Sequence, residues 1–249
     1  MAPGVIGVIP ARYGSTRFPG KPLALIKGVP MVQRVYQRCR RARLLDEVVV
    51  ATDDRRIADC VAGFGGRAVM TSPRHRSGSD RIAEVLRKLD IRNSEFEIVV
   101  NVQGDEPLVS PAAIDQLARA MLADRELQMA TLATAFRDRR ELESPDTAKI
   151  VVDGEGYALY FSRAVIPHAR EAADFQLRRY RKHIGMYAYR AAFLRRFTGW
   201  KAGRLERAER LEQLRALEHG VRIKVVATRH YSPSVDTRQD LKRAERLAR

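Results

Sequence analysis

The segment that covers residues 10–23 has the residue types of a loop that binds phosphate groups. It follows the apolar run Val5–Ile9 and reads Pro-Ala-Arg-Tyr-Gly-Ser-Thr-Arg-Phe-Pro-Gly-Lys-Pro-Leu. Arg12, Arg17 and Lys21 supply three positive charges, and the glycines and hydroxyls add backbone and side-chain donors. Such an apolar run is typical of a buried parallel strand, and open α/β sheets bind ligands at the carboxyl ends of their strands. The sequence therefore predicts a triphosphate site here, and a surface loop with scattered charges is the alternative.

The loop differs from the P-loop of ATPases and GTPases. In that motif the second glycine is followed by Lys and then by a Ser or Thr whose hydroxyl binds magnesium. Here Gly14 and Gly20 are one residue too far apart, and Lys21 precedes Pro22, which has neither a hydroxyl nor a backbone N–H.

Two aspartates follow strands that we expect to end at the same edge of the sheet. Asp105 comes just after the predicted strand Ile98–Val102, and Asp236 follows the predicted last strand Arg222–Ala227. Magnesium commonly binds one or two carboxylates together with substrate phosphates, so these aspartates are predicted to hold a magnesium ion opposite the basic loop. For Asp236 the alternative is the N-cap of the next helix, a role that Thr237 can take instead.

Further polar residues stand at the start of predicted helices. Asp53 and Asp54 end a strand and could line the nucleotide pocket, although Asp54 is equally suited to cap a helix. The run Ser-Gly-Ser-Asp-Arg at residues 77–81 opens a helix whose backbone amides, with Arg81, could reach a base or a phosphate. A plain capped helix start is the alternative for this run.

A last group of candidates depends on two predicted elements. Alternation places His183 and Tyr187 on one face of a strand, and an amphipathic helix, Leu205–Leu217, could bring Glu212 or Gln213 toward them. From spacing alone, a packed histidine and tyrosine beside a solvated helix remain the alternative.

The apolar pattern predicts the α/β sheet that positions these residues. Short apolar strands alternate with stretches of helical spacing, which is typical of a mostly parallel sheet flanked by helices. The predicted strands are Val5–Ile9, Glu47–Ala51, Arg67–Met70, Ile98–Val102, Met129–Phe136, Ala148–Val152, Tyr157–Phe161, Lys182–Tyr189 and Arg222–Ala227, and the predicted helices are Met31–Arg43, Arg55–Gly63, Ser77–Leu89, Pro111–Ala123, Leu205–Leu217 and Arg238–Arg249. A glycine-rich turn at residues 153–156 predicts a hairpin. We expect one domain over residues 1–249, in which about 130–200 form a subdomain or dimer arm.

The composition indicates a globular protein of the cytoplasm. The chain has 249 residues, of which 45% are hydrophobic, and a chain of this size can bury a substantial core. The sequence shows neither an apolar run long enough to cross a bilayer nor a signal-peptide pattern, so we expect a cytoplasmic protein without membrane insertion. Cys39 and Cys60 have no CxxC partner, and we expect them to be small core or half-buried residues.

The formal net charge of +16 raises the alternative of a protein that binds nucleic acid. The cations are mostly arginines spread along the chain, and no helix-turn-helix, zinc-finger or RNP-type signature accompanies them. We therefore expect most of them on solvated faces and a minority at small anionic ligands, and we predict no nucleic-acid partner.

Six segments of the chain resemble, in order, the signature segments of one enzyme family. They begin at Pro10, Ala51, Ser77, Asn101, Tyr160 and Val235 and read Pro-Ala-Arg…Ser-Thr-Arg…Pro-Gly-Lys-Pro-Leu, Ala-Thr-Asp, Ser-Gly-Ser-Asp-Arg, Asn-Val-Gln-Gly-Asp-Glu-Pro, Tyr-Phe-Ser-Arg and Val-Asp-Thr. Spread over nearly the whole chain, they resemble the 3-deoxy-manno-octulosonate cytidylyltransferases, the CMP-Kdo synthetases of Gram-negative bacteria. The first and fourth segments favour this family over its sialic-acid relatives. Ser79 departs from the family, which usually has Thr there.

This resemblance implies an activity. Members transfer CMP from CTP to the anomeric hydroxyl of 3-deoxy-manno-octulosonate (Kdo) and release pyrophosphate, which supplies lipopolysaccharide synthesis. The implied fold is a Rossmann-like nucleotidyltransferase fold in a homodimer. A cytidylyltransferase for another acidic sugar, such as a sialic acid or 8-amino-Kdo, remains the nearest alternative.

The resemblance also implies roles for individual residues. Asp105 and Asp236 would bind the cofactor Mg²⁺ and, with Arg12 and Lys21, form the catalytic group. The implied contacts with CTP come from Ala11, Arg12, Ser15, Arg17, Lys21, Ser79 and Arg81. The implied contacts with the sugar acid come from Gln103, Arg163, His183, Tyr187, Glu212 and Gln213, with Arg163 a suitable partner for the sugar carboxylate.

Overall fold

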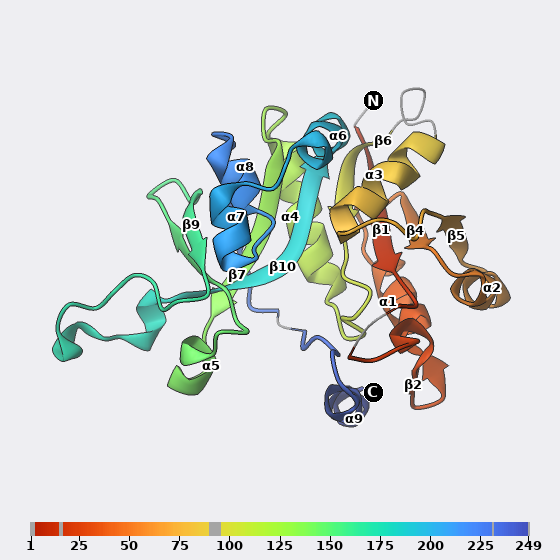
Figure 1. Ribbon diagram of the computed structural model, residues 1–249, viewed down its shortest axis with the longest axis horizontal. Coiled ribbons are helices and arrows are strands. Elements are labelled where there is room, and N and C mark those ends of the chain that lie inside the picture. The colour runs from red at the N-terminus through yellow and green to blue at the C-terminus, as the bar shows by residue number, and fades with distance from the viewer. Residues whose placement is uncertain (1–2, 15–16, 90–95, 231, 249) are drawn as a thin grey trace.

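The computed structural model describes residues 3–14, 17–89, 96–230 and 232–248. Within them the strands are β1 (Gly4–Ala11), β2 (Leu25–Ile26), β3 (Val29–Pro30), β4 (Glu47–Thr52), β5 (Arg67–Met70), β6 (Phe96–Asn101), β7 (Met129–Ala135), β8 (Lys149–Val152), β9 (Ala158–Ser162), β10 (Arg181–Arg190) and β11 (Ile223–Ala227). The helices are α1 (Met31–Cys39), α2 (Arg55–Gly63), α3 (Gly78–Lys88), α4 (Pro111–Ala123), α5 (Arg139–Glu143), α6 (Ala191–Gly199), α7 (Arg204–Glu209), α8 (Leu214–Glu218) and α9 (Arg238–Leu247). Figure 1 shows their arrangement.

One large sheet runs through the molecule in the order β11-β7-β10-β6-β1-β4-β5. β1 pairs in parallel with both β4 and β6, and β5 continues the parallel half beyond β4. β10 is antiparallel to both of its neighbours in this order, β6 and β7, so the predicted parallel sheet is confirmed for the first half and becomes mixed in the second. Because the chain leaves β1 on one side toward β4 and returns on the other as β6, the strand order reverses at β1. Ligands of open α/β sheets bind at such a reversal.

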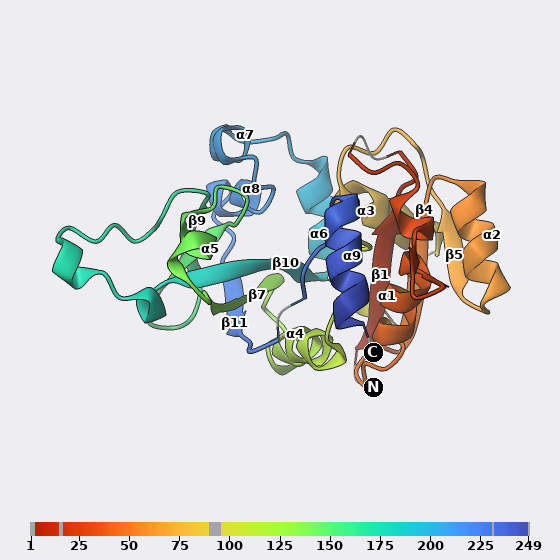
Figure 2. The same ribbon diagram turned by 90° about the horizontal axis from the view of Figure 1, so that it is seen from below.

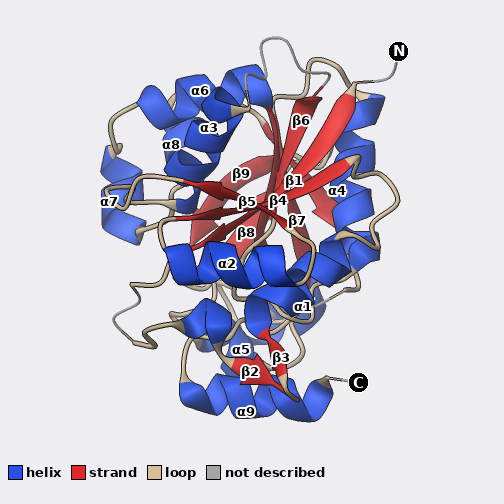
Figure 3. Cartoon of the chain, turned by 90° about the vertical axis from the view of Figure 1, so that its right-hand side faces the viewer, coloured by secondary structure: helices blue, strands red, loops and turns tan. Residues whose placement is uncertain are grey.

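Helices cover both faces of the sheet (Figure 3). On one face, apolar residues of α1, α2 and α4, such as Val35, Val61 and Leu117, form a fully buried cluster with the strands. On the other face, Leu86 of α3, Phe197 of α6 and residues of α8 form a second one. The strands between two such layers are buried on both sides, which explains their nearly continuous apolar sequences.

The C-terminal helix α9 packs away from the main layers. It lies at the lower edge of Figure 1, on the side toward which β1 runs. Ala244 of α9 and Val235 before it share a small apolar cluster with Phe18 and Ile26. This packing ties the segment that carries Asp236 to the end of the basic loop.

One predicted helix is wrong, and its failure matters for the site. The expected helix Leu205–Leu217 is two short helices, α7 and α8, separated at Arg210, which has the left-handed φ of 52°. The carboxylate of Glu209 accepts hydrogen bonds from the Ser162 hydroxyl at 2.6 Å and from the Arg163 backbone N–H at 2.9 Å. These tertiary bonds hold the end of α7 against β9, which overrides the helical preference of the sequence. Residues 210–213 consequently form an irregular segment.

The hairpin predicted around residues 153–156 is confirmed, because β8 and β9 pair antiparallel across that turn. Beyond β9, the chain up to about residue 180 extends away from the sheet, at the left of Figures 1 and 2. Phe136, Leu142 and Tyr180 form a small apolar cluster at its base. Cys39 is buried, Cys60 is half-buried and both are free. The helices described are all too short or too polar to span a bilayer.

Candidate active site

A cavity of about 330 Å³ lies where β1 and β6 end, and we call it the basic cavity. Its lining consists of Pro10, Ala11, Arg12, Arg17, Lys21, Pro22, His75, Arg76, Ser77, Gly78, Arg81, Gln103, Gly104, Asp105 and Asp236. The predicted nucleotide residues Ala11, Arg12, Arg17, Lys21 and Arg81 are therefore together. Ser15 lies outside the described residues.

On one wall of this cavity, the backbone at Gly104 lies very close to the backbone at Pro10. A Cβ at Gly104 would lie 2.5 Å from the carbonyl oxygen of Pro10, so this position accepts only glycine at the present spacing. Asp105 follows directly. The tight contact brings its carboxylate up to the basic loop.

Lys21 joins the two predicted metal ligands. Its Nζ lies 2.8 Å from Asp105 Oδ2 and 3.2 Å from Asp236 Oδ1, and its side chain is 14% exposed. The backbone below it is fixed in one turn of 3₁₀ helix, Lys21–Leu23, that begins after Gly20 in the left-handed conformation. Two carboxylates that are far apart in the sequence, Asp105 and Asp236, therefore face the same ammonium group.

Asp236 is available for this contact because its neighbour caps the helix. The Thr237 side chain accepts a hydrogen bond from the Asp240 backbone N–H, and the Asp240 carboxylate accepts one from the Thr237 N–H, which completes a capping box. The alternative role of Asp236 as the N-cap is thus wrong. Its Oδ1 also lies 3.3 Å from Arg17 Nη2.

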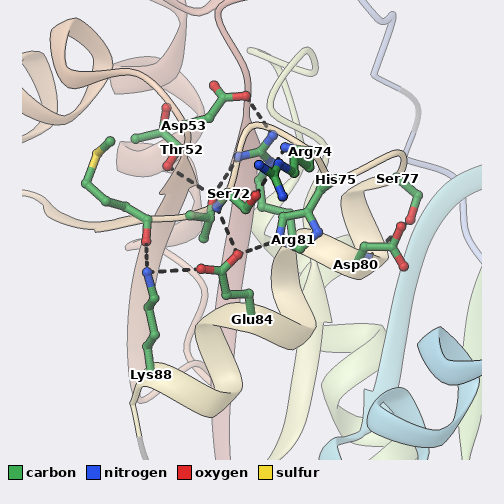
Figure 4. A network of polar contacts seen from close by, with 12 residues as sticks. Thr52, Asp53, Ser72, Arg74, His75, Ser77, Asp80, Arg81, Glu84 and Lys88 are labelled. Atoms are coloured by element: carbon green, nitrogen blue, oxygen red, sulfur yellow. Dashed lines mark hydrogen bonds and ion pairs between the residues drawn. The ribbon is translucent and has the colours of Figure 1, made fainter.

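The loop between β5 and α3 forms another wall of the basic cavity and is bound to α3 (Figure 4). Glu84 accepts hydrogen bonds from the Ser72 backbone N–H at 2.9 Å and from His75 Nε2, and its other oxygen pairs with Lys88 at 3.0 Å. Burial raises the pKa of Glu84, but these donors outweigh it and lower the pKa to about 2. An ionised Glu84 thus fixes the loop that carries residues 75–78.

Arg81 links this wall to the end of β4. Its guanidinium donates to Thr71 Oγ1 at 2.6 Å and to Asp53 Oδ2 at 2.8 Å. Asp53 in turn accepts from the Tyr13 backbone N–H at 3.4 Å. Asp54 caps α2, and Ser77 caps α3, so both capping alternatives of the sequence hold, while Ser77 also lines the cavity.

A second cavity of about 610 Å³ adjoins the first, and we call it the polar cavity. Its lining consists of Gln103, Asp105, Glu106, Asp146, Thr147, Ala148, Arg163, Lys182, His183, Ile184, Gly185, Tyr187, Arg210, Leu211, Glu212, Gln213, Ser232, Ser234 and Asp236. All six predicted sugar residues are in this set. Gln103, Asp105 and Asp236 line both cavities.

His183 and Tyr187 lie side by side on β10, with ring centroids 5.4 Å apart. They stay together although the pairing of β10 with β7 shifts between Ile184 and Tyr187. The His183 ring packs edge-on against Phe161, and its Nε2 lies 3.0 Å from Thr131 Oγ1. Burial of the ring lowers the pKa of His183 to about 3, and burial raises the pKa of Tyr187. Both side chains are therefore neutral hydrogen-bonding groups near pH 7.

The break between α7 and α8 places Glu212 and Gln213 in the polar cavity. Glu212 Oε2 accepts from the Ser79 hydroxyl at 2.7 Å, and burial raises the pKa of Glu212. Ser79 was predicted to contact CTP, but it does not line the basic cavity. Its side chain is buried behind the cavity wall, with 1% exposure, and its hydroxyl holds Glu212 instead.

Buried polar atoms without a hydrogen-bond partner concentrate around the polar cavity. Among the described residues these atoms are Glu106 Oε2, Gln116 Oε1, Glu212 Oε1, Gln213 Nε2 and Ser232 Oγ. All except Gln116 belong to residues that line the cavity. Buried polar groups in native proteins almost always have partners, so a polar ligand is expected to supply them here.

Arg163 is held by the two segments on either side of it. Its Nε donates to the Glu209 carbonyl oxygen at 2.9 Å and its Nη1 to the Pro145 carbonyl oxygen at 2.9 Å. Beneath it, the buried Lys149 Nζ donates to three carbonyl oxygens, including that of Arg163 at 2.6 Å. The guanidinium thus borders the polar cavity in a fixed position.

The sequence did not identify several lining residues. In the basic cavity these are His75 and Arg76, which follow β5 and could have been found from the rule that ligands bind after strand ends. In the polar cavity they include Glu106, which follows Asp105 at the same strand end, and Lys182, Arg210 and Ser232, for which no spacing signal exists. In the described part of the chain, no three His, Cys, Asp or Glu side chains form a group that could hold a metal ion alone.

Comparison with known proteins agrees with this geometry. Residues 6–223 match the cytidylyltransferase family. The chain is 51% identical to the 3-deoxy-manno-octulosonate cytidylyltransferase of Desulfatibacillum aliphaticivorans, over 98% of both chains. It is 49% identical to the protein of that name from Desulfosudis oleivorans, over 98% of this chain and 96% of the relative. A solved structure of CMP:2-keto-3-deoxy-manno-octonic acid synthetase complexed with CTP superposes with a TM-score of 0.91 and 42% identity, over 98% of each chain.

Proposed function

The chain belongs to the cytidylyltransferase family, and we propose that it transfers CMP from CTP to the anomeric hydroxyl of Kdo, with release of pyrophosphate. The observation that carries this proposal is the junction of the two cavities. A basic cavity suited to a triphosphate and a polar cavity suited to a sugar acid share Gln103, Asp105 and Asp236. A sugar hydroxyl and a nucleotide phosphate can therefore meet beside two carboxylates.

In the basic cavity, we assign Arg12, Arg17 and Lys21 to the triphosphate of CTP. Guanidinium and ammonium groups bind phosphate oxygens through charge-assisted hydrogen bonds, and all three line the same space. Ala11, Ser15 and Arg81 are assigned to shape the nucleotide pocket. Ser79, which lies behind the wall of the basic cavity, is assigned instead to hold Glu212 of the polar cavity.

Asp105 and Asp236 fit a magnesium ion, because both carboxylates already face one cation, the Lys21 ammonium, at 2.8 Å and 3.2 Å. Two carboxylates completed by substrate phosphates and water are a usual environment for Mg²⁺. When bound there, Mg²⁺ would lower the pKa of the attacking sugar hydroxyl and neutralise phosphate charge.

In the polar cavity, we assign Gln103, His183, Tyr187, Glu212 and Gln213 to the hydroxyl groups of Kdo. Glu212 and Gln213 each have a buried polar atom that a sugar hydroxyl can satisfy. The Gln103 amide is oriented by donation to the Gly185 carbonyl oxygen at 3.0 Å. Arg163 is assigned to the sugar carboxylate, which it can meet with a guanidinium already held in place.

The reaction needs no covalent enzyme intermediate. The sugar hydroxyl oxygen forms a bond to the α-phosphorus of CTP, the bond from that phosphorus to the bridging oxygen of pyrophosphate breaks, and the hydroxyl proton leaves to solvent. Lys21 and Arg12 stabilise the charge that grows on the pyrophosphate. The sugar residues hold the hydroxyl in line with that bond.

We further propose a cytoplasmic homodimer that supplies CMP-Kdo to lipopolysaccharide synthesis. CTP is a cytoplasmic nucleotide, which supports the location. The projecting segment after β9 and the exposed Leu159 on β9, at 60% exposure, supply a surface for a second copy of the chain.

A pyrophosphate-release assay with CTP, Mg²⁺ and Kdo tests the activity. We expect turnover with Kdo and much slower turnover with a sialic acid or 8-amino-Kdo at equal concentration. Omission of the sugar is the control for CTP hydrolysis. Release that is equal for all three sugars, or absent with Kdo, would contradict the proposed substrate.

A further inference from the structure

The Lys21 ammonium lies in the position between Asp105 and Asp236 where a cation is needed. Its Nζ contacts one oxygen of each carboxylate, at 2.8 Å and 3.2 Å. Arg17 Nη2 lies 3.3 Å from the same Asp236 oxygen. Two negative charges are thus matched by two positive charges in this part of the site.

This balance leaves a metal ion little electrostatic advantage. A free Mg²⁺ gives up its water reluctantly and binds two carboxylates well only where their charge is not already neutralised. With Lys21 in place, a divalent ion entering from solvent meets a group of zero net charge and a nearby ammonium that repels it.

The side chain of Lys21 can leave this position while its backbone stays fixed. The Gly20 N–H donates to the Tyr13 carbonyl oxygen at 3.0 Å, and the Ala24 N–H donates to the Lys21 carbonyl oxygen at 3.1 Å. Above this rigid turn, the ammonium is carried on a flexible four-carbon stem with rotatable donors. Triphosphate oxygens in the basic cavity, which Lys21 also lines, offer it stronger partners.

We propose that Lys21 is a place-holding cation: it keeps Asp105 and Asp236 together, opposes divalent metal binding in the absence of nucleotide, and moves to the triphosphate when CTP brings the metal. This inference rests on the proposed function for the identity of the nucleotide. It makes Lys21 a positioning residue for the metal ligands, in addition to its assigned contact with the leaving group.

Direct binding of Mn²⁺ alone, measured by the loss of its free EPR signal, tests the proposal without turnover. Lys21→Met removes the charge and keeps much of the stem. We expect it to bind Mn²⁺ roughly tenfold or more tightly than the parent when no nucleotide is present. Lys27→Met is the matched control, because it makes the same change in net charge at an exposed lysine on the turn between β2 and β3, and it should bind as the parent does.

A second neutral variant and a double variant complete the test. Lys21→Gln provides a second neutral variant if Lys21→Met fails to fold, and added Mg²⁺ should raise the melting temperature of either variant more than that of the parent. In Lys21→Met/Asp105→Asn, the gain in Mn²⁺ affinity should disappear, since one ligand is lost.

Equal Mn²⁺ affinity in the parent, both Lys21 variants and the Lys27 control would overturn the proposal. So would a gain that survives in the double variant. If no pyrophosphate is released with Kdo while the Mn²⁺ affinities change as expected, the proposed substrate is wrong and the role of Lys21 stands. If turnover with Kdo is normal and all these proteins bind Mn²⁺ with equal affinity, only the role of Lys21 is wrong.

Discussion

The hydroxyl of Ser79 donates a 2.7 Å hydrogen bond to Glu212, 133 positions later in the chain. Ser79 belongs to the first turn of α3, beside the loop that lines the basic cavity, and Glu212 lines the polar cavity. One bond thus joins the walls of the two predicted substrate sites.

Ser79→Ala should weaken sugar binding more than CTP binding. It removes one of the donors to the buried Glu212 carboxylate, which costs about 1–3 kcal/mol of stability and leaves that carboxylate less firmly held. We expect a raised KM for Kdo, a nearly unchanged KM for CTP and a lower melting temperature.

Ser79→Thr is the control, since it retains the hydroxyl. It should preserve the KM for Kdo. If Ala and Thr at this position give the same sugar kinetics, the hydrogen bond does not position Glu212.

Asp105→Asn should nearly abolish turnover while leaving the fold intact. The change removes charge from the pair of carboxylates that face Lys21, and with it the proposed metal site. Pyrophosphate release and thermal melting measure the two effects separately. Asp59→Asn, at a 66% exposed side chain, is the control and should keep full activity. Near-normal release by folded Asp105→Asn protein would remove Asp105 from the metal site.

Much of this site follows from local sequence rules, and the remainder depends on tertiary contacts. Strand ends located Asp105 and Arg12, because an apolar run that stops at polar residues marks the sheet edge by itself. The choice between Asp236 and Thr237 as the helix cap required the structure, since either side chain suits an N-cap. The break at Arg210 depends on bonds from Glu209 to β9, which no periodicity contains.

Acid should destabilise the protein through His183. The folded-state pKa of about 3 lies below the ordinary value of 6.5, because burial disfavours the charged ring. As the pH falls below about 6.5, His183 is protonated in the unfolded chain but stays neutral in the folded chain. The free energy of unfolding therefore decreases, by at most about 1.4 kcal/mol per pH unit. The contribution is absent above that pH.

Denaturant unfolding between pH 5.0 and 7.0 measures this contribution as the difference in slope between the parent and His183→Gln. The absolute slope also contains Glu106, whose pKa burial raises to about 8 and whose contribution to stability has the opposite pH dependence in both proteins. His183→Gln should lose less stability than the parent as the pH falls from 7.0 to 5.0. His168→Gln, at an exposed histidine beyond β9, should lose as much as the parent does. Parallel curves for the parent and His183→Gln would show that His183 does not titrate as expected.

Arg163→Lys should raise the KM for Kdo and leave CTP binding unchanged. Lysine keeps the charge but lacks the planar fork that can grip a carboxylate with two parallel hydrogen bonds. The structure adds a second effect: the guanidinium also donates to the carbonyl oxygens of Glu209 and Pro145, so the variant should lose about 1–2 kcal/mol of stability.

Comparison with Arg163→Met separates these effects, because Met and Lys both lose the two backbone contacts, whereas only Lys retains a positive charge. If Arg163 binds the sugar carboxylate, the two variants should melt at similar temperatures while Arg163→Met has the far higher KM for Kdo. CTP titration of both variants should match the parent, since Arg163 does not line the basic cavity. Lowered melting temperatures with unchanged sugar kinetics in both variants would instead make Arg163 a purely structural residue that ties the segment after β9 to the end of α7.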